Sequence, residues 1–244
     1  MLKHIVVGTI IAVLPAAAVA TGNAHWAYEG SEGPAHWGEM SEDFAACNGR
    51  RQSPIDLKGA RKGDNEDVSL AWKPFAPVVL NNGHTIQANA AAGNTTKSAD
   101  KTYVLRQMHF HHLSEHSVDG KLSPMEAHFV HEGPGGNLLV LGVLIKEGKE
   151  NPEIAKLWEV APAKEGEATA KSAVDFAKLV PVRSDFYRYG GSLTTPPCSE
   201  IVEWVVFRDP ITASKEQIEA FARLYPANNR PVQSLNDRTI VFGN

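Results

Sequence analysis

The sequence predicts a mainly β fold of the α+β class, with a large central, mostly antiparallel twisted sheet and short peripheral helices in a single domain. Short runs rich in Val, Ile, Leu and aromatic residues follow one another between Gly, Pro, Asn or Asp residues, as strands do. The connections between these runs are short, which favours hairpins. Only two segments show clear helical signals, and the composition, 43% hydrophobic and 21% charged, is typical of a globular protein with a core.

Four runs have the composition expected of the main strands. They are "TYVLRQMHFH" (102–111), "EAHFVHE" (126–132), "NLLVLGVLIKEG" (137–148) and "EIVEWVVFRD" (200–209). The first three follow each other closely, so we expect neighbouring strands to pair antiparallel.

Two segments predict helices. In "NPEIAKLWEV" (151–160), Asn151 is a favoured N-cap and is followed by a proline at the first helical position. In "SKEQIEAFARLY" (214–225), Ser214 and Gln217 have the spacing of a capping box, and the apolar residues then recur with helical period. Pro226 ends this second helix.

The N-terminus has the features of a secretory signal peptide. Lys3 precedes an apolar run that is too short to span a membrane, and Ala18-Val19-Ala20 is a cleavage pattern. We therefore expect a signal peptide over residues 1–20 and one mature domain over 21–244, located in the periplasm or secreted, with no membrane association after cleavage. The alternative is an N-terminal membrane anchor, which the small residues before Thr21 disfavour.

The cysteines predict a disulfide, and the charge of the chain argues against a nucleic-acid-binding protein. Cys47 and Cys198 are the only cysteines, and an isolated pair in an oxidising compartment usually forms a disulfide. Two free thiols are the alternative. The formal charge of −4 and the pI of about 6.2 give no sign of a nucleic-acid partner, which would require a basic surface.

Four of the ten histidines lie within "QMHFHHLSEH" at 107–116. Side chains on a strand alternate between its faces, so Gln107, His109 and His111 share one face, whereas Phe110 and His112 point to the other. Two imidazoles at i and i+2 stand about 6–7 Å apart. They can converge on one ion, but a tight zinc site needs a third ligand.

The next expected strand offers two candidates, His128 and His131, on opposite faces. If the two strands pair antiparallel, either histidine could meet the first pair. His128 has the better neighbour, because Glu126 on the same face can accept the free N–H of a metal-bound imidazole. Gln107 stands in the same relation to His109. The other histidines of this region (His112, His116 and His131) are expected to be hydrogen-bonded structural residues.

These residues, with others in the same order, resemble the α-class carbonic anhydrases in their shorter bacterial form. "QMHFHHLSEHSVDGKLSPMEAHFVH" is similar to the zinc site of that family. Further similar segments are "HWAYEG" and "GPAHW" (25–37), "RQSPIDL" (51–57), "NNGHTIQ" (81–87), "YGGSLTTPPCSEIVEW" (189–204) and "NNRPVQSLNDR" (228–238). The resemblance covers most of the mature chain and implies the α-carbonic anhydrase fold.

The resemblance implies zinc-dependent, reversible hydration of carbon dioxide to bicarbonate and a proton. His109, His111 and His128 correspond to the ligands of one Zn²⁺, and Gln107 and Glu126 to the partners of His109 and His128. Thr194 corresponds to the threonine that orients zinc-bound hydroxide for attack on carbon dioxide, and Glu115 to the glutamate that orients Thr194. The remaining correspondences are His84 as proton shuttle; Tyr28, Asn82 and Gln87 as its water network; Thr195 for bicarbonate; and Val130, Val140, Leu193, Val202 and Trp204 as the apolar wall for carbon dioxide.

The sequence also departs from the family. His112 stands where Trp or Thr is frequent, and Leu113 where proline is frequent, so packing or an additional metal contact at His112 could differ. His84, in the turn-like "NNGH", is expected to be exposed. The resemblance to bacterial members allows a homodimer.

Two other classes compete with this enzyme. A secreted zinc-binding protein without catalysis would lack a ligand or the Thr194–Glu115 pair, and this chain has all of them. A metalloprotease would carry H-E-x-x-H on a helix, which the sequence does not contain.

Overall fold

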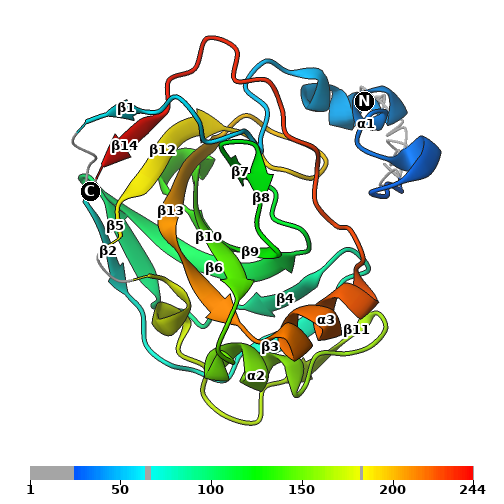
Figure 1. Cartoon of the computed structure of the whole chain (residues 1–244), viewed down its shortest axis with the longest axis vertical. Helices are drawn as coiled ribbons and strands as arrows, with labels where there is room; N and C mark the ends of the chain where they lie inside the picture. Colours follow the sequence, from blue (N-terminus) through cyan, green and yellow to red (C-terminus); the bar gives the residue numbers. More distant parts are fainter. Residues whose placement is uncertain (1–24, 64–66, 182–183, 244) are drawn as a thin grey trace, which may run out of the picture.

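A large twisted sheet forms the centre of the molecule (Figure 1), and the computed structural model describes residues 25–63, 67–181 and 184–243. The expected signal peptide lies outside these residues. The strands of the sheet are β1 (Arg61–Lys62), β2 (Val68–Ala71), β3 (Val78–Asn81), β4 (Ile86–Asn89), β5 (Thr95–Ser98), β6 (Lys101–His111), β9 (Met125–Glu132), β10 (Leu138–Glu147), β11 (Gly166–Thr169), β12 (Phe186–Gly191), β13 (Val202–Ala213) and β14 (Val241–Gly243). A separate hairpin is formed by β7 (Ser117–Val118) and β8 (Lys121–Leu122).

The expected antiparallel pairing holds for the strands that carry the histidines. β6 pairs antiparallel with β9, and β9 with β10. The connection between β9 and β10 is short, as predicted, whereas the connection between β6 and β9 contains the separate hairpin of β7 and β8. The sheet as a whole is mixed, however, because β13 lies parallel to β10. The chain between these two strands contains α2 (Pro152–Trp158), β11 and β12, and a connection of that length can return to the same edge in the parallel direction.

β13 also runs past its expected end at residue 209 to Ala213. The register between β10 and β13 shifts where Val143 pairs with Phe207 but Ile145 pairs with Ile211. The extra residues of β13 between these two pairs therefore have no partner on β10. Pro210 lies in this irregular stretch, where a residue without an N–H is tolerated.

The helices are short and lie at the periphery, as predicted. Both N-caps are confirmed: Asn151 accepts main-chain hydrogen bonds at the start of α2, and Ser214 and Gln217 form a capping box at α3 (Lys215–Leu224). The remaining helices are α1 (Trp37–Met40) and the 3-10 helices η1 (Gly30–Glu32), η2 (Glu42–Asn48), η3 (Pro134–Gly136) and η4 (Phe176–Leu179). Among the described residues, no helix is long and apolar enough to cross a membrane.

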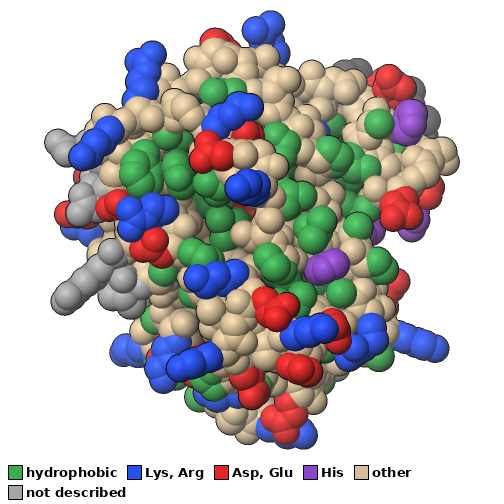
Figure 2. Space-filling model, in the orientation of Figure 1, with side chains coloured by type: hydrophobic (Ala, Val, Ile, Leu, Met, Phe, Trp, Pro, Cys, Tyr) green, Lys and Arg blue, Asp and Glu red, His purple; other side chains and the backbone are tan. Residues whose placement is uncertain are grey.

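The main core lies between one face of the sheet and the helices α2, η4 and α3. Met108 and Phe110 of β6 point into this core together with Phe129 of β9, so the alternate residues of both strands point to the opposite face. That opposite face carries the histidines. On the outside, acidic and basic side chains are intermingled around the end of the molecule where α2 and α3 lie (Figure 2), in keeping with the small net charge.

The expected disulfide between Cys47 and Cys198 is present and joins positions 151 residues apart. It packs with Trp37 and Phe44 in a small separate cluster of buried side chains. The bridge therefore connects the N-terminal helices to the loop that precedes β13.

Replacing both cysteines with serine is expected to lower the free energy of unfolding by about 2–5 kcal/mol, because a cross-link over so long a loop restricts the unfolded chain. Urea denaturation of the variant and of the oxidised protein measures the difference. The reduced native protein is the control and should unfold like the variant. Equal midpoints for the variant and the oxidised protein would contradict the prediction.

Candidate metal centre and its surroundings

The register between β6 and β9 brings three histidines together. His109 lies directly opposite His128, and His111 follows two residues after His109 on the same face of β6. The imidazole centroids are 4.6 to 5.2 Å apart, and one nitrogen of each ring lies within 4.8 Å of the others. Because His131 lies on the other face of β9, the geometry selects His128.

The outward nitrogen of each ring donates a hydrogen bond. His109 Nδ1 donates to Gln107 Oε1 at 2.8 Å, and His128 Nε2 donates to Glu126 Oε1 at 2.9 Å. His111 Nδ1 donates to the main-chain oxygen of Asn228 at 2.7 Å. A neutral imidazole that donates from one nitrogen keeps a lone pair on the other, so these bonds turn three lone pairs toward one point.

Burial and charge set the protonation of the cluster. Burial lowers the pKa of His109 well below its ordinary value, and the neighbouring His111 and His128 lower it further. Burial also lowers the pKa of His111. For His128 burial acts in the same direction, but the charge and hydrogen bond of Glu126, together with the charge of Glu115, outweigh burial and raise the pKa. His128 is therefore the most basic of the three rings.

Glu126 is a buried carboxylate with several donors around it. Burial alone would raise its pKa, but charge and hydrogen bonds from His116 and His128 hold the pKa well below its usual range. Its Oε2 accepts the main-chain N–H groups of Glu115 and His116 at 3.0 and 2.9 Å. His116 Nδ1 donates to Oε1 at 2.8 Å, and its Nε2 lies 2.7 Å from the Tyr189 hydroxyl.

Glu115 is also fully buried and faces two of the three imidazoles, those of His111 and His128. Its Oε1 accepts the main-chain N–H of Arg230 at 2.9 Å. Its Oε2 has no hydrogen-bond partner and lies 3.5 Å from His111 Nε2 and 3.8 Å from His128 Nδ1. Thr194 is buried as well, but among the described residues no hydrogen bond joins its side chain to Glu115.

The unpartnered atoms indicate what this site can hold. His111 Nε2 is buried without a hydrogen-bond partner, which is costly unless another group binds it. It faces the free nitrogens of His109 and His128 at distances compatible with a shared ion. Three neutral nitrogen donors fit a divalent metal with a fourth coordination position left open.

A cavity of about 120 Å³ opens beside His109 and His111. Thr195 and His84 also line it, and the His84 ring stacks on Trp26 with the centroids 3.8 Å apart. The stacking leaves His84 half-buried rather than exposed as expected, and burial lowers its pKa. The expected water-network residues Tyr28, Asn82 and Gln87 also line this cavity.

The turn that presents His84 is built by Asn82, whose Oδ1 accepts the main-chain N–H groups of His84 and Thr85 at 3.0 and 2.9 Å. This confirms the turn predicted from the "NNGH" segment. Tyr28 lines the same cavity. Burial raises its pKa well above the ordinary value, and the charge of Glu115 adds to this, so its hydroxyl stays protonated.

The five residues expected to form an apolar wall belong to one hydrophobic cluster. Val140, Val202 and Trp204 are buried, and Val130 and Leu193 pack against them. The Trp204 ring lies 4.8 Å from the His128 ring, measured between centroids. This cluster therefore continues directly from the third histidine.

The other histidines are bound elsewhere, as expected. His112 Nδ1 donates to the main-chain oxygen of Pro226, and His131 lies between Thr96 and the main chain of Leu139. His116 is also structural, although it braces Glu126 directly.

Two residues of the site, Asn228 and Arg230, are not predicted from the sequence; they hold His111 and Glu115 through main-chain atoms. Every residue except proline has both of these main-chain groups, so no side-chain pattern reveals the two contacts.

Comparison with known proteins identifies the family to which this chain belongs. The family model for eukaryotic-type carbonic anhydrases matches residues 32–243, and this chain belongs to that family. A carbonic anhydrase from Pectobacterium carotovorum is 44% identical over 227 residues, which cover 92% of this chain and 93% of the relative. One from Neisseria gonorrhoeae is 41% identical and covers 95% and 94% of the two chains.

Solved structures agree with this assignment. The α-carbonic anhydrase of Thermovibrio ammonificans, in complex with the inhibitor sulfanilamide, matches with a TM-score of 0.88 and 47% identity, over 90% of this chain and all of the other. Dioscorin, in complex with ascorbate, has a TM-score of 0.84 at 26% identity over 90% of this chain and 98% of its own. The fold is therefore shared by proteins with different names.

Replacing Glu126 with glutamine is expected to weaken the binding of a divalent metal about 10- to 100-fold, because the His128 ring loses its ionised acceptor. Competition between the protein and a chromophoric chelator for Zn²⁺ measures the affinity. Glu132→Gln is the matched control: Glu132 lies on the same strand but pairs with Arg106 at the surface. Equal affinities for the two variants would contradict the role given to Glu126.

Proposed function

We propose that this carbonic anhydrase hydrates carbon dioxide with one Zn²⁺ held by His109, His111 and His128. The observation that carries the proposal is the convergence of three imidazole nitrogens, each with its second nitrogen tied to an acceptor. When bound, zinc supplies a Lewis acid that lowers the pKa of a coordinated water to about 7, for which carbonic anhydrase is itself the standard example. Neutral ligands suit this chemistry because they leave the metal its positive charge.

Thr194 and Glu115 are assigned to orient the attacking oxygen. Glu115 Oε2 lacks a partner and is available to accept a hydrogen bond from the Thr194 hydroxyl. A threonine that donates its proton in this way can only accept from the nucleophile, which fixes the direction of the lone pair that attacks. Arg230 restrains the other oxygen of Glu115 through its main-chain N–H.

The surroundings of the three histidines provide one region for the substrate and another for the proton that the reaction releases. The apolar cluster around Val140 and Trp204 is assigned to carbon dioxide, which has no net charge or dipole to lose on leaving water. Thr195, in the adjacent cavity, is assigned to bicarbonate. The same cavity leads to His84, whose imidazole can accept a proton near neutral pH and pass it to solvent. Tyr28, Asn82 and Gln87 are assigned to order water between them.

A binding protein without catalysis is the alternative, because a fold alone does not decide the function of a protein. This chain keeps the three histidines, their acceptors and the buried Glu115, which favours the enzyme.

For the location of the protein, we propose that residues 1–20 are removed and that the mature chain acts in the periplasm or outside the cell. The disulfide supports an oxidising compartment.

Replacing His109 with alanine is expected to reduce carbon dioxide hydration to the rate in buffer alone, because two imidazoles do not retain the metal tightly. Stopped-flow hydration by the zinc-loaded protein measures this. His112→Ala is the matched control, since the ring next to His111 is bound to Pro226 instead and its loss should leave the rate unchanged. A native protein no faster than His109→Ala would end the enzyme proposal.

Replacing His84 with alanine is expected to lower the maximal rate about 10-fold or more in weak buffer, because the proton loses its carrier to solvent. Imidazole added to the solution should restore the rate. His36→Ala, at an exposed histidine of the N-terminal region, serves as control. If the loss were the same in concentrated buffer and were not rescued, His84 would have another role.

A further inference from the structure

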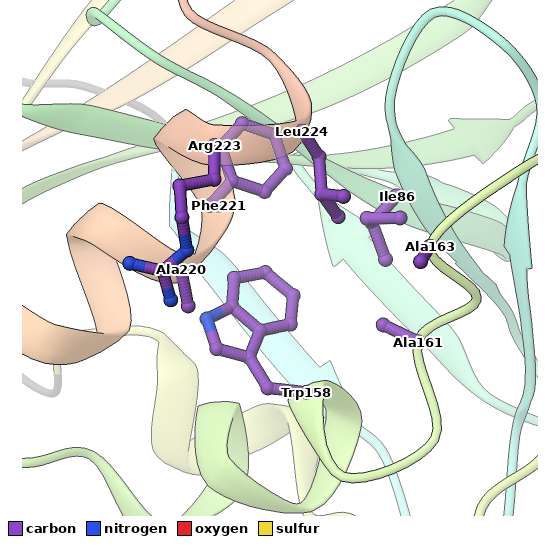
Figure 3. Close-up of a pocket in the computed structure, with 8 residues that line it drawn as sticks. All are labelled: Ile86, Trp158, Ala161, Ala163, Ala220, Phe221, Arg223 and Leu224. Carbon is purple, nitrogen blue, oxygen red and sulfur yellow. The ribbon is translucent and has the colours of Figure 1, made fainter.

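A second cavity lies on the far side of the sheet from the histidines. It has a volume of about 150 Å³ and is enclosed by β4, the end of α2 and α3 (Figure 3). Seven of its eight lining side chains are apolar, and the eighth is Arg223. The apolar residues are Ile86, Trp158, Ala161, Ala163, Ala220, Phe221 and Leu224.

The walls of this cavity are fixed by the fold. Trp158 Nε1 donates to the main-chain oxygen of Gln217 at 3.0 Å, and the Trp158 ring stacks on Phe221 with an interplanar angle of 17°. Phe110 of the core supports Trp158 at 4.8 Å between centroids. Ile86 and Phe221 are each 1% exposed. The hollow is therefore preformed.

Arg223 is the one charged group of the lining, and it is exposed. Among the described residues it makes no ion pair or side-chain hydrogen bond. Glu219, one turn earlier on α3, could have neutralised it but lies 3.8 Å from Lys215 instead. A guanidinium at the rim of an apolar hollow is complementary to a ligand with one apolar end and one anionic end.

The size of the cavity selects among such ligands. An apolar cavity of about 150 Å³ holds a single benzene ring. A guanidinium binds a carboxylate through two parallel hydrogen bonds. We propose that this cavity binds monocyclic aromatic carboxylates of the size of benzoate, with the ring between Trp158 and Leu224 and the carboxylate on Arg223.

The proposed site is separate from the metal centre. Ile86 faces this cavity, whereas its neighbour Gln87 lines the cavity beside His109 on the opposite face of β4. Occupancy can therefore be measured without reference to catalysis.

Benzoate is the probe, and the readout is the NMR signal of the Trp158 indole N–H in the zinc-loaded protein, assigned with Trp158→Phe. Benzyl alcohol and benzylamine are the neutral and cationic probes of the same size. Benzoate is expected to shift this signal at millimolar concentration and to bind about 3- to 5-fold more tightly than benzyl alcohol, as expected for an exposed ion pair. Benzylamine should bind more weakly than both.

Two variants, with a third as control, separate the contribution of the benzoate ring to binding from that of its carboxylate. Arg223→Leu should reduce benzoate affinity to that of benzyl alcohol, whereas Arg106→Leu, at a surface arginine elsewhere, should change nothing. Ala161→Leu fills the hollow and should abolish the shift for all probes. Binding at the metal centre instead would persist in Ala161→Leu.

Four results would overturn the proposal. The first three are no Trp158 shift with benzoate, equal binding of benzoate and benzylamine, and benzoate binding unchanged in Ala161→Leu. A Trp158 shift that depends on protein concentration without any probe would assign the hollow to a second copy of the chain, which would also overturn it.

Discussion

The register between β6 and β9 is the constraint on which the whole site depends. With His109 opposite His128, three imidazoles face one side of the sheet and Phe110 and Phe129 face the core. A slip of one residue would send His128 into the core and a phenylalanine toward the cavity. Burying an imidazole there without partners, and losing an aromatic from the core, both oppose that slip. The apolar residues that fold the sheet therefore also fix the metal centre.

The histidines need a fixed orientation as well as a fixed position, and buried acceptors supply it. Glu126 is the most connected of these, since it receives hydrogen bonds from the main chain of Glu115 and from the side chains of His116 and His128. An ionised carboxylate with no exposure to solvent is stable only with such donors. The same donors prevent the carboxylate from turning toward the free nitrogens of the cluster, so Glu126 orients His128 without competing for a metal.

The sequence predicts those parts of the structure that depend on local patterns. β6, β9 and β10 begin and end within one residue of their expected bounds, and both helix caps form as their residues indicate. Strand alternation with Glu126 nearby favoured His128 over His131 before any pairing was known. The parallel pairing of β10 with β13 was not predictable in this way, because the segment between them sets the direction through long-range contacts.

The contacts made by the C-terminal segment show why the rest of the site escapes a sequence argument. Asn228 and Arg230 hold His111 and Glu115 with a main-chain carbonyl and a main-chain N–H, and these groups do not depend on the type of side chain, proline excepted. Asn228 is held by its own side chain, which bonds the main chain of His84, Phe110 and His112. The Arg230 side chain is buried, donates to the main-chain oxygens of Ser53 and Cys47 and lies over the Trp37 ring. Cys47 is bridged to Cys198, which lies only a few residues after Thr194. Arg230 and the disulfide therefore connect the N-terminal helices to Glu115 and to Thr194, the two residues assigned to orient the nucleophile. The order of the centre therefore extends well beyond its ligands, because a shift of the N-terminal segment would reach Glu115 through Arg230 and Thr194 through the bridge.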